Sequence, residues 1–329
     1  MRPALRVHPR LLGLGAIASI LLVAAVLTQA HVRLVSSQVI SVIARQTEEK
    51  VPVDDPRAAV WESVAPVEIP LSAQAAAIPL GGGSIRAVAV RALRDDKRIY
   101  FRLEWDDQTK DMSAFAPQDF RDAAAIELPA SGVSTLPSFC MGQTNGQVNI
   151  WHWKADWQAD IDNGFVSVPE AYPNAAVDYY PFQDENTFYA GRAAGNILSQ
   201  TSRNTPVENL VSSGFGTLAT GEGQMVGGKG VWDNGKWYVL FDREMKAQGD
   251  TYTPLEPGQK TNVAFAVWDG SKGERDGIKS VSQFAELTVG GAGGGGVNTP
   301  SIVILGILLA VVAGAAGYVI YNERLKKRA

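Results

Sequence analysis

The sequence predicts an all-β fold: an antiparallel β-sandwich with long loops over one face, flanked by terminal membrane helices. Three observations predict the sandwich. The central region consists of short apolar segments, several of these alternate with a period of two residues, and turns rich in Gly, Asp and Pro separate them. No part of this region carries a long helical period. The 329 residues, 46% of them hydrophobic, have a globular composition, and a sandwich of about 200–250 residues can form one domain.

Two hairpins are the clearest elements. In the first, residues 85–93 and 98–105 flank a charged turn, and the second strand alternates apolar with polar residues, which predicts one buried face. In the second, residues 231–232 and 237–241 flank Asn234-Gly235, a strong hairpin turn. Further strands are expected at 67–71, preceded by an anchoring Trp61, and at 123–128, 262–268 and 284–289.

Residues 160–228 are poor in strand signals and contain several Tyr and Pro residues. A structureless insertion of this length is uncommon and tends to be functional. We therefore expect loops folded over one face of the sandwich, where a ligand or a partner would lie. A surface excursion without function is the alternative.

Residues 1–30 are predicted to be a signal peptide or an N-terminal membrane anchor. Basic residues precede an apolar run at 11–27, and Thr28-Gln29-Ala30 offers a small-residue cleavage site. The run is short for a spanning helix of about 20 residues, although the amphipathic stretch 32–43 could extend it. Residues 31–53 are expected to be a linker, and 54–289 the folded domain.

The C-terminal end predicts a membrane anchor. Residues 290–300 form a Gly-rich linker, 301–321 form an uncharged run that would span about 30 Å as a helix, and 322–329 form a basic tail. Basic residues flank membrane helices on their cytoplasmic side. The domain is therefore expected on the extracytoplasmic (periplasmic) side of the cell membrane, with the C-terminus in the cytoplasm.

Charge and cysteine content exclude several functions. The net charge of −4 and the absence of a basic stripe argue against nucleic acid as a partner. Cys140 is the single cysteine, so no internal disulfide can form, and no CxxCH motif exists for covalent haem attachment. An iron–sulfur cluster or a Cys-rich zinc site is excluded for the same reason.

The stretch 138–157 gathers the residues that could carry chemistry. It holds Cys140, Met141 and His152, and also three Trp residues, at 151, 153 and 157. Met is more often a packing residue, and Cys140 is expected to be a small buried hydrophobe that points away from Met141. His152 lies opposite in phase to Trp151 and Trp153, so a structural role or contact with a propionate is expected before a role as ligand.

Several motifs occur in a fixed order that covers most of residues 54–289. They are the hairpin at 84–107, Phe139-x-Met141-Gly142 with 149–154 (NIWHWK), 191–196 (GRAAGN), 214–217 (GFGT), and 267–270 (VWDG) through 276–280 (DGIKS). They resemble the haem-binding gamma subunits of ethylbenzene dehydrogenase, dimethylsulfide dehydrogenase and the chlorate and selenate reductases. The C-terminal helix departs from the soluble periplasmic members.

The resemblance implies one haem b, bound non-covalently, with a Met and a Lys as axial ligands. The Met corresponds to Met141 and the Lys to Lys279, with Lys272 as its competitor in the same loop. A Lys amine can bind iron only when it is deprotonated, so its pKa must be lowered by burial. Trp151 and Trp153 share a strand face, for which core packing is the default role, and they would also line the haem. Arg192 and Asn196 would either hold its propionates or cap a loop.

The resemblance further implies a cytochrome subunit without a catalytic site of its own. It would pass electrons between the iron–sulfur subunit of a molybdenum oxidoreductase and the respiratory chain, with the molybdenum catalytic subunit as a second partner. An extracytoplasmic carbohydrate-binding sandwich is the main alternative, in which Trp-rich stretches form exposed platforms. A copper site at His31, if cleavage made it the amino terminus, is a third possibility.

Overall fold

The computed structural model describes residues 40–75, 78–176, 189–246, 249 and 252–291. The predicted N-terminal segment 1–30, the membrane helix 301–321 and the basic tail 322–329 lie outside these residues. So does nearly all of the Gly-rich linker. Among the helices that are described, none is long and apolar enough to cross a membrane.

The described chain is mostly β-structure. Its strands are β1 (Ser41–Gln46), β2 (Val67–Pro70), β3 (Ser72–Ala73), β4 (Ala87–Arg94), β5 (Arg98–Asp106), β6 (Ala123–Pro129), β7 (Val148–Lys154), β8 (Val207–Ser212), β9 (Ala219–Thr220), β10 (Gly227–Asp233), β11 (Lys236–Glu244), β12 (Lys260–Trp268), β13 (Ser280–Val281) and β14 (Ala285–Val289). The α-helices are α2 (Ala155–Asn163), α3 (Val168–Ala171) and α5 (Ala190–Ala193), and the 3-10 turns are η1 (Ala59–Ser63), η2 (Ile197–Ser199) and η3 (Gly270–Lys272).

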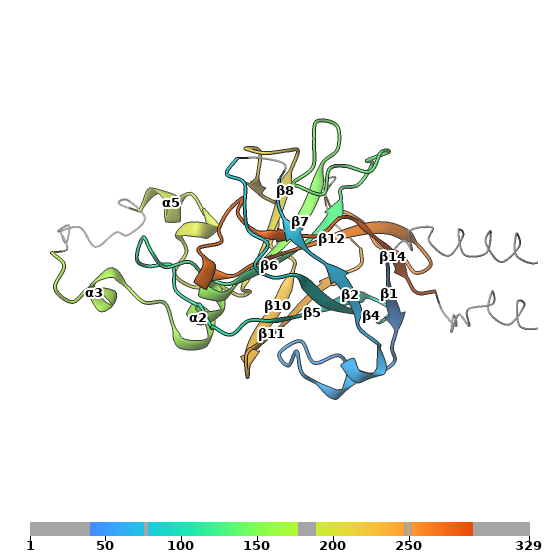
Figure 1. Cartoon of the computed structure of the whole chain (residues 1–329), viewed down its shortest axis with the longest axis horizontal. Helices are drawn as coiled ribbons and strands as arrows, with labels where there is room; N and C mark the ends of the chain where they lie inside the picture. Colours follow the sequence, from blue (N-terminus) through green and yellow to red (C-terminus); the bar gives the residue numbers. More distant parts are fainter. Residues whose placement is uncertain (1–39, 76–77, 177–188, 247–248, 250–251, 292–329) are drawn as a thin grey trace, which may run out of the picture.

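The strands form two layers that share one strand. The first sheet runs β10-β11-β5-β4-β1-β14, with β2 also on β4, and the second runs β6-β7-β8-β9. Strand β12 belongs to both, because residues 260–263 pair with β14 and residues 264–268 pair with β6. Figure 1 shows α2, α3 and α5 at one end of the molecule and β1 and β14 at the other. This arrangement confirms the predicted sandwich.

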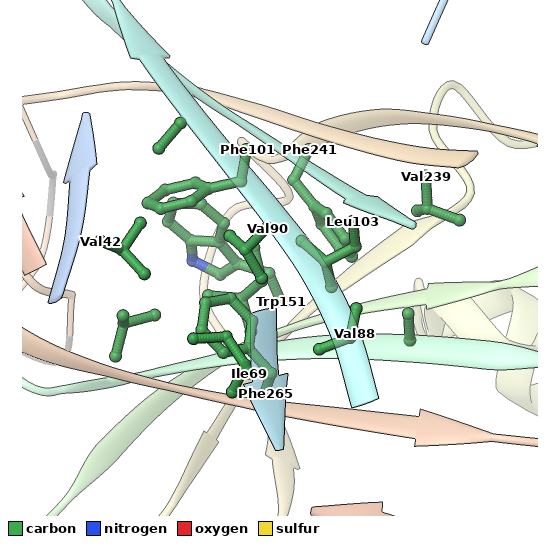
Figure 2. Packing of buried hydrophobic residues seen from close by; sticks show 14 of the residues in the cluster. Val42, Ile69, Val88, Val90, Phe101, Leu103, Trp151, Val239, Phe241 and Phe265 are labelled. Carbon is green, nitrogen blue, oxygen red and sulfur yellow. The ribbon is translucent and has the colours of Figure 1, made fainter. Parts of the chain in front are cut away.

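The main core lies between the two layers. Figure 2 shows Trp151 of β7 among Val90 and Phe101 of the first sheet and Phe265 of β12. The Phe101 and Trp151 rings meet edge to face, with 5.9 Å between their centroids. Each aromatic side chain buries a large apolar area, and edge-to-face pairs add stabilisation beyond that area. The dense aromatic packing therefore fixes which face of β7 points inward.

Both predicted hairpins are confirmed. In the turn between β4 and β5, the carboxylate of Asp95 accepts hydrogen bonds from the backbone N–H groups of Lys97 and Arg98, both at 2.7 Å. Between β10 and β11, Asn234 and Gly235 both have positive φ, of 49° and 79°, which a tight hairpin turn of this twist requires.

The second strand of the first hairpin is buried on both faces, not on one as expected. Tyr100 and Arg102, on the outer face of β5, are 4% and 2% exposed. Residues 51–64 cover them, and the Arg102 guanidinium lies 5.5 Å from the centroid of the Trp61 ring. An alternating strand can therefore be covered on its polar face when a separate segment supplies partners for the charges.

Two predicted boundaries are corrected. The expected linker 31–53 includes strand β1, which pairs in parallel with both β14 and β4, so the folded domain begins before residue 54. The expected loop region 160–228 includes strand β8, which pairs with β7 in the second sheet. Only part of this region therefore consists of loops, and it also includes η2 and the short helices α3 and α5.

Candidate functional site

A cavity of about 460 Å³ lies on the outer face of the second sheet. Its floor is formed by Ala123 of β6, Ile150 and His152 of β7, Leu210 of β8 and Trp268 of β12. These residues alternate with the ones that enter the main core, because successive side chains of a strand point to opposite faces. The small side chain of Ala123 leaves space that a larger residue would fill.

Loops from distant parts of the chain enclose this floor. Residues 78–79, 119–121, 215–218 and 274–279 contribute to the cavity wall. The described part of the 160–228 region contributes Leu210, Phe215 and Leu218. Among the loops expected to lie over one face, the one at 215–218 lies at the outer face of the second sheet.

Met141 lines the cavity from a constrained turn. Its φ of 68° lies in the left-handed region, which is uncommon for any residue other than Gly. Its backbone N–H donates to a carboxylate oxygen of Glu127 at 3.1 Å. Its carbonyl accepts hydrogen bonds from the Ser212 hydroxyl at 2.7 Å and the Gly214 N–H at 2.8 Å. Such a conformation persists only where its surroundings enforce it, and it is typical of functional sites.

Lys279 reaches the same cavity from the loop before β13. Its side chain is 8% exposed and its Nζ lies 5.0 Å from the centroid of the Trp268 ring. Within the described residues this amine makes no ion pair. Burial lowers the pKa of Lys279, and the charge of Glu127 opposes that effect. The cavity thus presents a Met thioether and a buried Lys amine together.

Glu127 lies between these two residues on β6. It is 8% exposed, and one of its carboxylate oxygens is buried without a hydrogen-bond partner in the described structure. Burial raises the pKa of Glu127, while the charge of Lys279 and the hydrogen bond from Met141 act against that rise. A buried acid in this position couples the electrostatics of both candidate ligands.

His152 also lines the cavity and carries a nitrogen that could bind a metal. Its ring stacks on Trp268, with 4.8 Å between centroids, and its Nε2 is buried without a hydrogen-bond partner in the described structure. Burial, followed by the charges of Lys154, Arg121 and Lys279, places the pKa of His152 well below its usual value. The imidazole is therefore neutral near pH 7.

A known protein family matches most of the folded domain. The family model described as ethylbenzene dehydrogenase matches residues 58–280. This chain belongs to that family.

Two curated relatives are similar over about 70% of this chain. A respiratory nitrate reductase heme subunit of Haloferax mediterranei is 29% identical over 236 residues, which cover 71% of this chain and 68% of the relative. The chlorate reductase subunit gamma of Ideonella dechloratans is 28% identical over 236 residues, covering 69% and 75%. Among solved structures, a family 9 carbohydrate-binding module of Caldicellulosiruptor kristjanssonii with glucose covers 78% of this chain and 99% of its own, at 10% identity and a TM-score of 0.38.

The structure brings the two predicted ligands together at the cavity. Met141 and Lys279 both line the cavity, whereas Lys272, the competitor of Lys279, is exposed at the end of η3 and does not line it. Cys140 is 2% exposed and packs as a small hydrophobe, as expected. Burial raises the pKa of the Cys140 thiol, which disfavours a thiolate.

Trp151 and Trp153 do not line the cavity, which corrects the expectation that they enclose the cofactor. Both are fully buried in the core between the sheets. Their alternation in the sequence placed them correctly on one face of β7. That face packs into the interior of the sandwich and not against the cavity. His152 lies on the cavity side because it is opposite in phase.

Arg192 and Asn196 also lie away from the residues that form the cavity. Asn196 caps the turn η2, its side chain accepting a hydrogen bond from the Leu198 N–H at 2.9 Å. The Arg192 guanidinium lies 4.9 Å from the Tyr189 ring centroid. Of the two roles expected for Asn196, propionate binding and capping a loop, the structure shows the cap.

Sequence reasoning missed Glu127 and Trp268 as site residues. Glu127 is a single charged residue in the apolar run 123–128, and that departure from the pattern was a usable signal. Trp268 occurs in the quoted motif 267–270. Arg121 and Arg275, which also line the cavity, are separated by more than 150 positions and carry no local signal.

Proposed function

We propose that this chain is the haem-binding electron-transfer subunit of a molybdenum oxidoreductase complex. Met141 and Lys279, from loops 138 residues apart in sequence, line one cavity, and this observation carries the proposal. The names of the two relatives, a nitrate reductase heme subunit and a chlorate reductase gamma subunit, support it.

The cavity residues fit a haem. Ile150, Leu210, Phe215 and Trp268 supply an apolar lining, which an extended aromatic macrocycle requires. Lys279 is a buried amine with a lowered pKa and no ion pair in the described structure, so deprotonating it costs less than it would in water. The backbone of Met141 is held in a strained conformation by three hydrogen bonds.

Met141 and Lys279 would hold one non-covalent haem b as its axial ligands. A haem with two protein ligands supplies one-electron transfer and leaves no open position for a substrate. The Met thioether favours the reduced state, and the wall residues exclude water. Arg121 and Arg275 line the cavity and are suited to bind the propionates. Propionate binding was one of the two roles expected for Arg192 and Asn196.

The partners are proposed to be a molybdenum catalytic subunit and an iron–sulfur subunit. The chain would carry electrons between the iron–sulfur subunit and the respiratory chain. The apolar runs at 11–27 and 301–321, with basic residues beside them, support anchoring in the cell membrane with the folded domain on the extracytoplasmic side.

The carbohydrate-binding alternative relied on exposed Trp platforms. All eight Trp residues lie within the described structure, and none is exposed: seven are buried and Trp232 is partly buried. A stacking platform of Trp side chains is therefore absent from this fold in its described part.

The deciding experiment is an optical spectrum of the full-length chain, produced with haem supplied and extracted in detergent, before and after dithionite. The full chain is needed because a domain cut at residue 45 would lose most of β1. We expect a low-spin ferrous spectrum with a b-type pyridine haemochrome. Met141→Ala and Lys279→Ala should each change it, whereas exposed Lys272→Ala should not.

The variant His152→Gln distinguishes iron binding by Met141 and Lys279 from iron binding by His152. If Met141 and Lys279 bind the iron, His152→Gln keeps the low-spin spectrum. If His152→Gln abolishes that spectrum and Lys279→Ala preserves it, the ligand is His152 and not Lys279. A folded, colourless protein that refuses haem would contradict the electron-transfer function.

A further inference from the structure

Three buried carboxylates converge at one end of the sandwich. Asp107 follows β5 of the first sheet, Asp122 precedes β6 of the second, and Asp269 follows β12, the strand shared by both. Each offers a carboxylate oxygen, and these oxygens all lie within 4.8 Å of one another. The three residues are 4%, 0% and 6% exposed. None of the three lines the cavity.

No basic side chain balances this cluster. In the described part of the chain, none of the three carboxylates forms an ion pair with Lys or Arg. Their hydrogen bonds come from neutral donors: Asp122 accepts from the Gly270 N–H at 2.9 Å and from Trp237 Nε1 at 3.0 Å. Buried charges in proteins are normally paired, protonated or bound to a metal.

The Asp107 side chain supplies an independent sign of a ligand. Its Oδ1 accepts from the Thr109 N–H and hydroxyl, both at 3.0 Å, but its Oδ2 is buried with no hydrogen-bond partner in the described structure. Asp111, in the same loop, also has a buried and unpartnered Oδ2. Unsatisfied buried oxygens are rare and call for an unmodelled water or ion.

We propose that Asp107, Asp122 and Asp269 bind a hard divalent cation, with calcium as the preferred ion. All of the donors are oxygens, which suit calcium and magnesium and not the softer transition metals. Calcium tolerates irregular coordination, so water can complete the shell around the three carboxylates. The site is independent of the proposed haem function, since no residue of the cluster lines the haem cavity.

The cation would join the two sheets to the loop that carries Lys279. Asp269 opens that loop, and its backbone N–H donates to Glu274 at 3.1 Å. The other carboxylate oxygen of Glu274 accepts from the Ser84 N–H at 3.0 Å. A cation at Asp269 therefore stabilises both the start of the loop and its attachment to the chain near Gly82 and Gly83.

The test uses the full-length protein stripped with EDTA and then titrated with calcium, magnesium or terbium. Trp237 donates to Asp122, so excitation of Trp should sensitise terbium emission at this site. We expect calcium to displace terbium and to raise the Tm by about 5 °C or more at saturation. Asp107→Asn keeps the acceptor for Thr109 but removes a charge, and should weaken calcium binding at least about tenfold.

Asp96→Asn, which removes an exposed carboxylate, is the matched control and should bind calcium as the wild type does. The Asp107→Asn variant should also exceed the wild type in Tm when EDTA is present, because one repulsive charge is gone. A wild-type protein that shows no calcium-dependent Tm and no Trp-sensitised terbium emission would overturn the proposal. If Asp107→Asn fails to fold, these wild-type measurements still decide the matter.

Discussion

The carboxylate of Glu127 accepts a hydrogen bond from the backbone N–H of Met141 at 3.1 Å. The same carboxylate acts electrostatically on the buried amine of Lys279. One acidic side chain on β6 therefore influences both candidate ligands, through the backbone of one and the charge of the other.

Glu127→Gln should shift haem binding to lower pH. As a ligand, Lys279 would bind iron only when deprotonated, so affinity should fall as the pH drops below its pKa. Burial lowers that pKa and Glu127 opposes it, so removing the charge lowers the pKa further, while Gln still offers an acceptor to Met141. The measurement is a pH titration of the low-spin absorbance between pH 5 and 9. Glu286→Gln, distant in the first sheet, is the control, and an upward or absent shift would refute the assignment.

Gly82→Ala should disrupt the position of Lys279. A Cβ at Gly82 would overlap the backbone of Lys279, whereas one at neighbouring Gly81 would meet only the Ile278 side chain at 3.5 Å. Both glycines have positive φ, of 89° and 138°, so both substitutions carry backbone strain. Steric overlap of this kind costs about 1–3 kcal/mol.

We expect haem affinity to fall about tenfold or more in Gly82→Ala and clearly less in Gly81→Ala. Haem titration of the two variants, side by side, measures the difference. Equal losses in both variants would show that strain alone, and not contact with Lys279, controls binding.

Gly230→Ala should destabilise the fold without changing the haem spectrum. A Cβ at Gly230 would overlap the ring of Trp153, which packs in the main core away from the cavity. The expected loss is about 1–3 kcal/mol in the free energy of unfolding. Gly291→Ala, where a Cβ meets nothing within 4 Å, is the control. Denaturant unfolding and the reduced spectrum together test the prediction, and an altered spectrum would contradict it.

The stability of the protein in EDTA should fall as the pH rises from about 4 to about 7. The pKa of Asp122 is raised from 3.8 to about 7 by burial and by Asp107, so the folded state holds a proton that the unfolded state releases. The stabilisation is complete below the unfolded pKa and is lost through the folded one, on the order of 4 kcal/mol in total. Urea unfolding across this range measures the slope.

Asp107→Asn should reduce that slope, because it removes the charge that raises the pKa of Asp122. Saturating calcium should reduce the slope in the wild type, since the cation favours the ionised carboxylates. A wild-type slope that is flat in EDTA would mean that Asp122 is ionised throughout.

Local turn chemistry explains why the hairpins were predictable. Asp95 satisfies two backbone N–H groups of its own turn, and Asn234-Gly235 adopts the positive φ values that the second hairpin needs. Neither feature depends on distant residues. Strand β8 was missed because its polar residues are buried: Glu208 pairs with Lys154, and Asn209 accepts a hydrogen bond from Asn149 at 2.8 Å. Their partners come from β7, which the local pattern cannot reveal.

The two faces of β7 show a second limit of prediction from the sequence. Period-two alternation grouped Trp151 with Trp153 and separated His152 from them. It could not decide which group faces the cavity, because that depends on the sheet packed against β7. The family motifs brought Met141 and Lys279 to attention, and the structure places both at the cavity. Glu127, which acts on both residues, belongs to none of these family motifs.

Strand β1 lies between β4 and β14, in parallel register with both. Ala44 faces Ala92 on one side and Val289 on the other, across about 245 positions of sequence. The first sheet therefore cannot close until the last strand has been synthesised. Long-range pairing of this kind slows folding and leaves a strand edge exposed in the meantime. During translation, β1 would wait with the edge that pairs with β14 unpaired, and the loops that form the cavity would be completed only just before the sheet itself.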